Sequence, residues 1–190
     1  MSEPTVDLTF PHSWYAKILA DNPATLPARH FIYPPEVEEV EQGALEVLIR
    51  PAKDTQGFLA TFALGFRDPA VPTGIWASPT RDEICAISGG YAYVVNTAEP
   101  ENFTMIEMRP VMEVRVMMAQ GQLLFIGHRE IHAWGIDGLA WESEKLSDEG
   151  IKITDIAGGI IYGTGWDRNT DRETRFAVDL PTGVRMPVRE

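Results

Sequence analysis

The chain has 190 residues, and its 28 Asp and Glu against 16 Lys and Arg give a formal net charge of −12. This length suits one compact domain, and a hydrophobic content of 44% indicates neither a disordered chain nor a membrane protein. Because the negative charge repels phosphate backbones and anionic lipid surfaces, we expect neither nucleic acid nor a membrane as a partner.

The first residues predict a cytoplasmic protein. The opening MSEPTVDLTFPHSW has no basic region and no apolar run of signal-peptide length. Later apolar runs are too short to cross a bilayer. The single cysteine, Cys85, suits a reducing compartment.

Residues 1–35 predict a proline-rich N-terminal arm. Six of the 14 prolines lie there, and each removes a backbone donor and favours extended geometry in the residue before it. Within the arm, Ser13 is suited to cap a short helix over residues 14–20, which the following Asn-Pro pair would end. The acidic segment EVEEVEQ, residues 36–42, fits either a helical turn or a solvated edge strand, facing solvent or a basic partner.

Residues 36–190 predict a single all-β domain. From Ala44 onward, short β-rich runs are separated by Gly, Pro, Asn and Asp at spacings of about eight to twelve residues. This pattern is typical of a mainly antiparallel sandwich or an open multi-stranded sheet, and no amphipathic helices alternate with the runs as a parallel sheet would require. The predicted strands span residues 44–50, 58–66, 74–79, 83–88, 92–97, 103–108, 112–118, 123–127, 131–135, 139–144, 151–156, 160–165 and 174–180.

Two C-terminal segments resemble a known family. Residues 123–146 are similar to the strand-hairpin-strand pattern of quinoprotein-type β-propeller blades; their sequence is LLFIGHREIHAWGIDGLAWESEKL. RFAVDLPTG, residues 175–183, resembles the strand and Asp-x-x-Thr-Gly turn that ends such blades. The resemblance implies blade-like hairpins but no closed propeller, because the first 120 residues show no repeat at that period. The residues that bind a quinone in that family have no counterpart here, so we expect no cofactor.

One candidate metal site is the loop DRNTDRE, where oxygen-bearing side chains recur at every second position, as in calcium-binding loops. The glycine that bends the helix-loop-helix version of such loops is absent, and Arg168 and Arg172 lie between the acids. We therefore favour a solvated turn and keep a hard cation as the alternative. The candidate ligands are Asp167, Asn169, Asp171 and Glu173.

A second candidate site is the H-x-E-x-H pattern of His128, Glu130 and His132. On one continuous strand these three side chains would project from the same face, at a spacing compatible with a metal. The favoured alternative is a turn through residues 127–130, which would leave His132 alone on the next strand.

The function that these features favour is binding rather than catalysis. No nucleophile elbow, P-loop or dinucleotide turn is present. We expect an acidic all-β protein that contacts another protein, in the manner of small acidic immunity proteins that neutralise a basic partner. Self-association into a homo-oligomer stays open. The alternative is a metal-assisted hydrolase built on the His/Glu/His pattern, or a carbohydrate-active enzyme that uses paired carboxylates and tryptophan.

Overall fold

A computed structural model describes residues 3–20, 27–35, 40–52 and 56–188. Strands hold 52% of these residues and helix holds 1%, so the predicted all-β class is confirmed. The sheets are open and mainly antiparallel, with parallel pairing of β1 with β6 and of β3 with β5. No helix in the described part of the chain has the length and hydropathy needed to cross a membrane.

The chain divides into two compact units, Met1–Pro110 and Val111–Glu190. The expected division, an arm over residues 1–35 and a single domain over 36–190, stays a prediction. The described residues of the expected arm contribute three strands to the sheets of the first unit.

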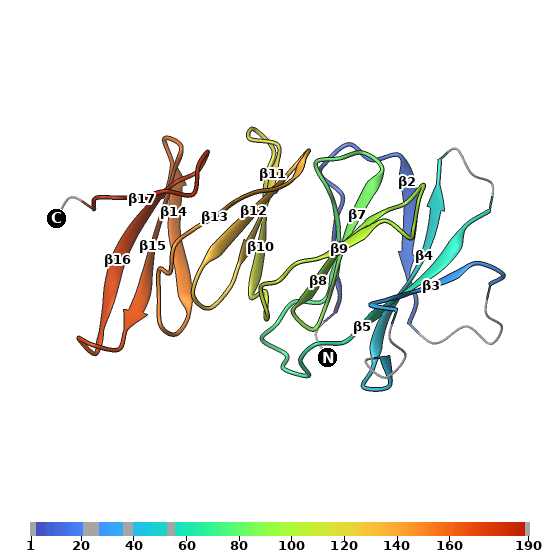
Figure 1. The fold of residues 1–190 in the computed structure, drawn as a ribbon, viewed down its shortest axis with the longest axis horizontal. Helices are drawn as coiled ribbons and strands as arrows, with labels where there is room; N and C mark the ends of the chain where they lie inside the picture. Colours follow the sequence, from blue (N-terminus) through green and yellow to red (C-terminus); the bar gives the residue numbers. More distant parts are fainter. Residues whose placement is uncertain (1–2, 21–26, 36–39, 53–55, 189–190) are drawn as a thin grey trace. The chain divides into compact units, whose positions relative to one another are not determined.

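The first unit contains two sheets (Figure 1). One has the order β1 (Thr5–Asp7), β6 (Gly74–Ala77), β7 (Glu83–Ser88), β8 (Tyr91–Asn96) and β9 (Phe103–Met105). The other has the order β2 (Trp14–Ile18), β4 (Ala44–Pro51), β5 (Phe58–Ala63) and β3 (His30–Tyr33). Aromatic rings join the two: the Phe62 ring on β5 lies 5.1 Å from Tyr33 and 5.4 Å from Tyr93 on β8.

The short helix predicted over residues 14–20 was wrong, because Trp14–Ile18 forms strand β2. This segment pairs antiparallel with Val47–Pro51, whose edge offers backbone hydrogen bonds that an isolated helix of about two turns cannot match. Ser13 does not cap a helix; its hydroxyl hydrogen-bonds the Arg81 carbonyl and Asp82. Residues 36–39 of EVEEVEQ lie outside the described residues, so the choice between helical turn and edge strand stays a prediction.

The second unit consists of two antiparallel meanders, each in chain order (Figure 1). The first comprises β10 (Glu113–Met117), β11 (Gln122–Ile126), β12 (Ile131–Gly135) and β13 (Gly138–Glu142). The second comprises β14 (Ile151–Ala157), β15 (Ile160–Asp167), β16 (Arg172–Asp179) and β17 (Arg185–Met186). The resemblance of residues 123–146 and 175–183 to propeller blades stays a prediction.

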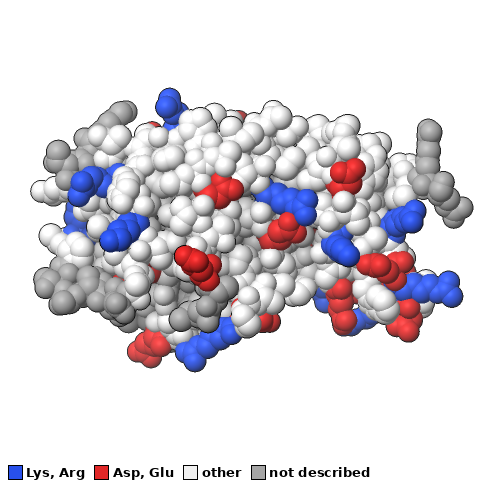
Figure 2. Space-filling view, turned by 180° about the vertical axis from the view of Figure 1, so that it is seen from behind, with Lys and Arg blue, Asp and Glu red and all other residues white. Residues whose placement is uncertain are grey.

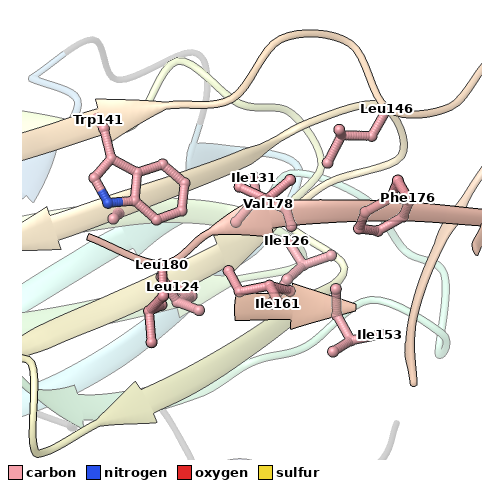
Figure 3. Packing of buried hydrophobic residues seen from close by; sticks show 11 residues of the cluster. Leu124, Ile126, Ile131, Trp141, Leu146, Ile153, Ile161, Phe176, Val178 and Leu180 are labelled. Carbon is pink, nitrogen blue, oxygen red and sulfur yellow. The ribbon is translucent and has the colours of Figure 1, made fainter. Parts of the chain in front are cut away.

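The core of the second unit lies between its two meanders (Figure 3). Alternation along each strand sends one set of side chains inward, and Trp141 of β13 contributes the largest of them. The β14–β17 sheet therefore has an inner face that is packed and an opposite face that carries its exposed side chains. The other core residues labelled in the figure are Leu124, Ile126, Ile131, Leu146, Ile153, Ile161, Phe176, Val178 and Leu180.

Candidate functional site

The H-x-E-x-H pattern does not form one site. The backbone N–H of Gly127 donates to the Glu130 carbonyl at 3.0 Å, which closes the turn between β11 and β12. His128 lies at the exposed tip of this turn, and His132 is on β12. The structure thus adopts the turn rather than the continuous strand, and it separates His128 from His132.

The structure brings His132 together with two carboxylates instead. Its Nε2 lies 3.2 Å from Oε1 of Glu130, and its Nδ1 lies 3.7 Å from Oε1 of Glu142, the neighbour of His132 across the β12–β13 pair. The Glu142 contact was not expected, because a β-bulge next to Trp134 sets its register. Among the residues that the structure describes, no three His, Cys, Asp or Glu side chains are grouped so that they could hold a metal ion.

The candidate calcium ligands lie on the β15–β16 hairpin and do not converge. Asp167 pairs with Arg172 across the hairpin, whereas Glu173 pairs with Trp166. Cross-strand partners share a face and successive residues alternate between faces, so Asp167 and Glu173 project to opposite sides. Asp167 accepts the N–H of Asn169 at 2.8 Å, which is the local hydrogen bond of a turn.

The most distinctive surface of the second unit is the outer face of the β14–β17 sheet, opposite its packed side. Tyr162, Thr164 and Trp166 follow one another at alternate positions of β15 and therefore project together. The Tyr162 and Trp166 side chains are 36% and 37% exposed. We define the outer face by these three residues of β15 with Glu173 and Arg175 of β16 and Met186 of β17.

Glycines on the packed side explain why the aromatic residues of β15 occur only on the outer face. A Cβ on Gly163 would lie 2.3 Å from the Phe176 ring, and a Cβ on Gly165 would lie 2.7 Å from the Leu146 carbonyl oxygen. Both positions therefore require glycine, since a side chain would overlap core atoms. The aromatic residues of the alternating Tyr-Gly-Thr-Gly-Trp segment are confined to the exposed side.

The outer face is hollowed beside Tyr162. A depression of about 990 Å³ is lined by Tyr162, Thr164, Arg175, Met186 and Val188, among others. Arg175 lies opposite Thr164, between the positions of Tyr162 and Trp166. Its guanidinium forms no hydrogen bond or ion pair with any residue in the part of the chain that the structure describes.

The two charged residues of β16 on this face differ in their contacts. Glu173 accepts a hydrogen bond from the Thr164 hydroxyl at 2.6 Å, which holds its carboxylate against the sheet. Arg175 has no such contact and remains available for an anion. The remaining charges of the sheet are also mixed in sign, and acidic and basic side chains are interspersed over the surface seen in Figure 2.

A neighbouring loop fixes one end of β15 by charge. Asp148 accepts the backbone N–H of Arg168 at 2.9 Å and contacts the Lys145 ammonium. The hydrogen bond from Lys145 holds the pKa of Asp148 below its ordinary value, and the bond from Arg168 adds to this effect. The hairpin that carries Trp166 is thereby tied to the loop before β14.

The chain matches no protein-family model, and comparison with curated proteins finds no similar sequence. The candidate site is therefore defined by geometry and chemistry alone.

Proposed function

We propose that this chain is a binding protein that contacts another protein through the outer face of the β14–β17 sheet. The observation that carries the proposal is the grouping of exposed Tyr162, Trp166 and Met186 around the unpaired Arg175 on one rigid sheet. Tyrosine, tryptophan, methionine and arginine are the residues enriched at protein interfaces, and Tyr, Trp and Arg account for most binding hot spots.

The chemistry of this face supports binding over catalysis. The two ionisable side chains on the face, Glu173 and Arg175, do not act on a common point, because Glu173 is held by the Thr164 hydroxyl and Arg175 makes no polar contact within the described residues. An enzyme site usually combines a deep pocket with convergent polar groups. A surface with exposed aromatic anchors and no convergent ionisable groups suits a protein partner better.

The distribution of charge suggests a division of roles. Residues 1–110 contain 15 Asp and Glu against seven Lys and Arg, whereas residues 111–190 contain 13 against nine. Most of the acidic excess thus belongs to the first unit. In this proposal the outer face supplies affinity, while the overall negative charge steers a partner with a basic region, as an immunity-like protein would require.

A carbohydrate ligand is the second candidate, because exposed aromatic rings also stack on sugars and Trp166 has a carboxylate, Glu173, as its cross-strand neighbour. The hydrolase built on His128, Glu130 and His132 has weaker support, since His128 lies at a turn tip away from His132.

The test is affinity capture from the native host with the immobilised chain, followed by mass spectrometry. We expect a protein retained by the wild type to be lost with the double variant Tyr162→Ala/Trp166→Ala. Tyr15→Ala is the matched control, because Tyr15 is a 64% exposed aromatic residue on β2 of the first unit. Equal capture by the wild type and the double variant would disprove the proposed face, and binding to a glycan array in place of a protein would favour the carbohydrate alternative.

A further inference from the structure

The uncovered edge of β16 lies directly beside the outer face. β17 pairs only with Ala177 and Val178, although β16 extends from Arg172 to Asp179. Pro187 follows β17 and has no N–H to continue the ladder. The first part of β16 therefore has a described strand on its β15 side alone.

Two hydrogen bonds at the end of β16 show which backbone groups point toward this uncovered edge. The N–H of Asp179 donates to Val184 on the β17 side at 2.8 Å, and the N–H of Leu180 donates to Gly159 on the β15 side at 2.9 Å. Backbone groups of successive strand residues alternate between the two edges. The N–H and C=O groups of Glu173 and Arg175 thus point away from β15, and they form no backbone bond on that side within the described residues.

The pairing beside this edge is more regular than the pairing at the opposite edge of the same sheet. The eight residue pairs of β15 and β16 continue without a register shift. In contrast, β14 contains a register shift between Ile153 and Asp155, and such bulges blunt an edge against further pairing. A strand from a partner is therefore accommodated better at β16 than at β14.

We propose that the partner adds an extended segment as a further strand along β16, at Glu173–Arg175, and places an acidic side chain against Arg175. The proposal rests on the proposed function, because it uses the same outer face. In strand addition, main-chain hydrogen bonds supply affinity and pockets for alternate side chains supply specificity. Here the depression beside Tyr162 receives an apolar side chain of the segment, and the unpaired guanidinium selects a carboxylate.

Charge favours a second copy of this chain as the occupant in only one register. In an antiparallel copy of the same edge, pairing centred on Thr174 would set Arg175 against Glu173 of the copy. A shift by one pair in either direction would instead set Arg175 or Glu173 against the same residue of the copy, which brings like charges together. Charged edge residues of this kind protect sheets from self-association.

The test is selection of a random linear peptide library displayed on phage against the immobilised full chain. We expect enriched peptides to alternate apolar and polar residues and to carry Asp or Glu at one alternate position. Arg175→Gln should weaken the binding of a selected peptide by about two- to fivefold, as for an exposed ion pair. Glu173→Pro should weaken it by about tenfold or more, because proline removes an outward N–H and obstructs the incoming strand.

The control variants separate loss of this edge from loss of the fold. Because the N–H of Glu173 is unbonded in the free chain, Glu173→Pro should leave the circular dichroism spectrum unchanged. Thr174→Pro removes an N–H that points toward β15 and should destabilise the sheet.

Selected peptides that bind Glu173→Pro as well as the wild type would overturn the strand-addition proposal, and so would a concentration-dependent dimer in sedimentation that is lost in this variant. If Tyr162→Ala/Trp166→Ala abolishes partner capture while Glu173→Pro does not, the face is correct and the edge is wrong.

Discussion

At the scale of single residues, glycine decides which side of β15 faces a partner. Gly163 and Gly165 leave space for the Phe176 ring and the Leu146 carbonyl, so at these two positions the inner side of the strand packs closely without a side chain of its own. Tyr162 and Trp166 then occupy the opposite side, where nothing in the described unit covers them fully. A rigid sheet holds such aromatic rings at a low entropic cost, which is an advantage at an interface.

Cys85 belongs to the core rather than to a reactive site. Its side chain is fully buried, and burial raises the pKa of the thiol, with the Glu83 carboxylate adding to the shift. We expect no reaction with a thiol reagent in the folded protein at about pH 8 and a rapid reaction after unfolding in urea, since the thiolate is the reactive form. Rapid labelling of the folded chain would contradict this expectation.

The raised pKa of Cys85 makes the free energy of unfolding depend on pH. Because the folded state holds the thiol proton more tightly than the unfolded state, the contribution of Cys85 is fully present below the ordinary thiol pKa. It should decline as the pH rises above about 8.5. Urea unfolding of the wild type and of Cys85→Ala between neutral and alkaline pH measures this contribution. A free energy difference that is independent of pH would disprove the assignment.

At the scale of elements, the turn between β16 and β17 is tied to the core through Gly183. Its φ of 72° is unfavourable for other residues, and an added Cβ would lie 2.5 Å from the Trp141 ring. Gly158, in the β14–β15 turn, has a similar φ of 59° but open space around its Cβ position. A comparison of alanine substitutions at the two glycines therefore separates the cost of backbone strain from the cost of steric overlap.

Gly183→Ala should lower the free energy of unfolding more than Gly158→Ala does. Both changes incur a left-handed backbone cost of about 1–2 kcal/mol, and Gly183→Ala adds about 1–3 kcal/mol from overpacking against Trp141. Urea unfolding of the two variants gives the comparison. Equal losses would show that the Trp141 ring moves aside freely.

The predicted elements differ from the observed ones mainly where the pairing of strands, rather than the local pattern of apolar residues, determines the structure. The strands Glu83–Ser88 and Ile131–Gly135 were predicted with their exact bounds, because each is a short apolar-rich run that a glycine-containing turn follows. The segment over residues 14–18 was predicted as helix but forms β2, since its partner β4 is distant in sequence. The strands β1, β3 and β17 were not predicted, because each has at most four residues.

At the scale of the whole molecule, bound calcium is not required to explain the acidic hairpin. Asp167 and Glu173 point to opposite faces, and Asp171 adopts a φ of 52°, a turn conformation that aspartate tolerates. We expect calcium and EDTA to leave the melting temperature unchanged within about a degree, since a stabilisation of 1 kcal/mol would shift a domain of this size by about 2–4 °C. A calcium-dependent rise that Asp167→Ala abolishes would show that the hairpin rearranges around an ion.

The all-β class and the approximate positions of strands β4 to β16 follow from the sequence, because the alternation of apolar residues and the spacing of turn residues act locally. The turn at residues 127–130 and the burial of Cys85 could be predicted for the same reason. The outer face could not be predicted in this way, although the alternation Tyr162-Gly-Thr164-Gly-Trp166 indicates that these three side chains share one face. The side of β15 that faces the core depends on its contacts with other strands. The position of the unpaired Arg175 beside Tyr162 depends on such contacts as well. Only the tertiary structure determines these contacts.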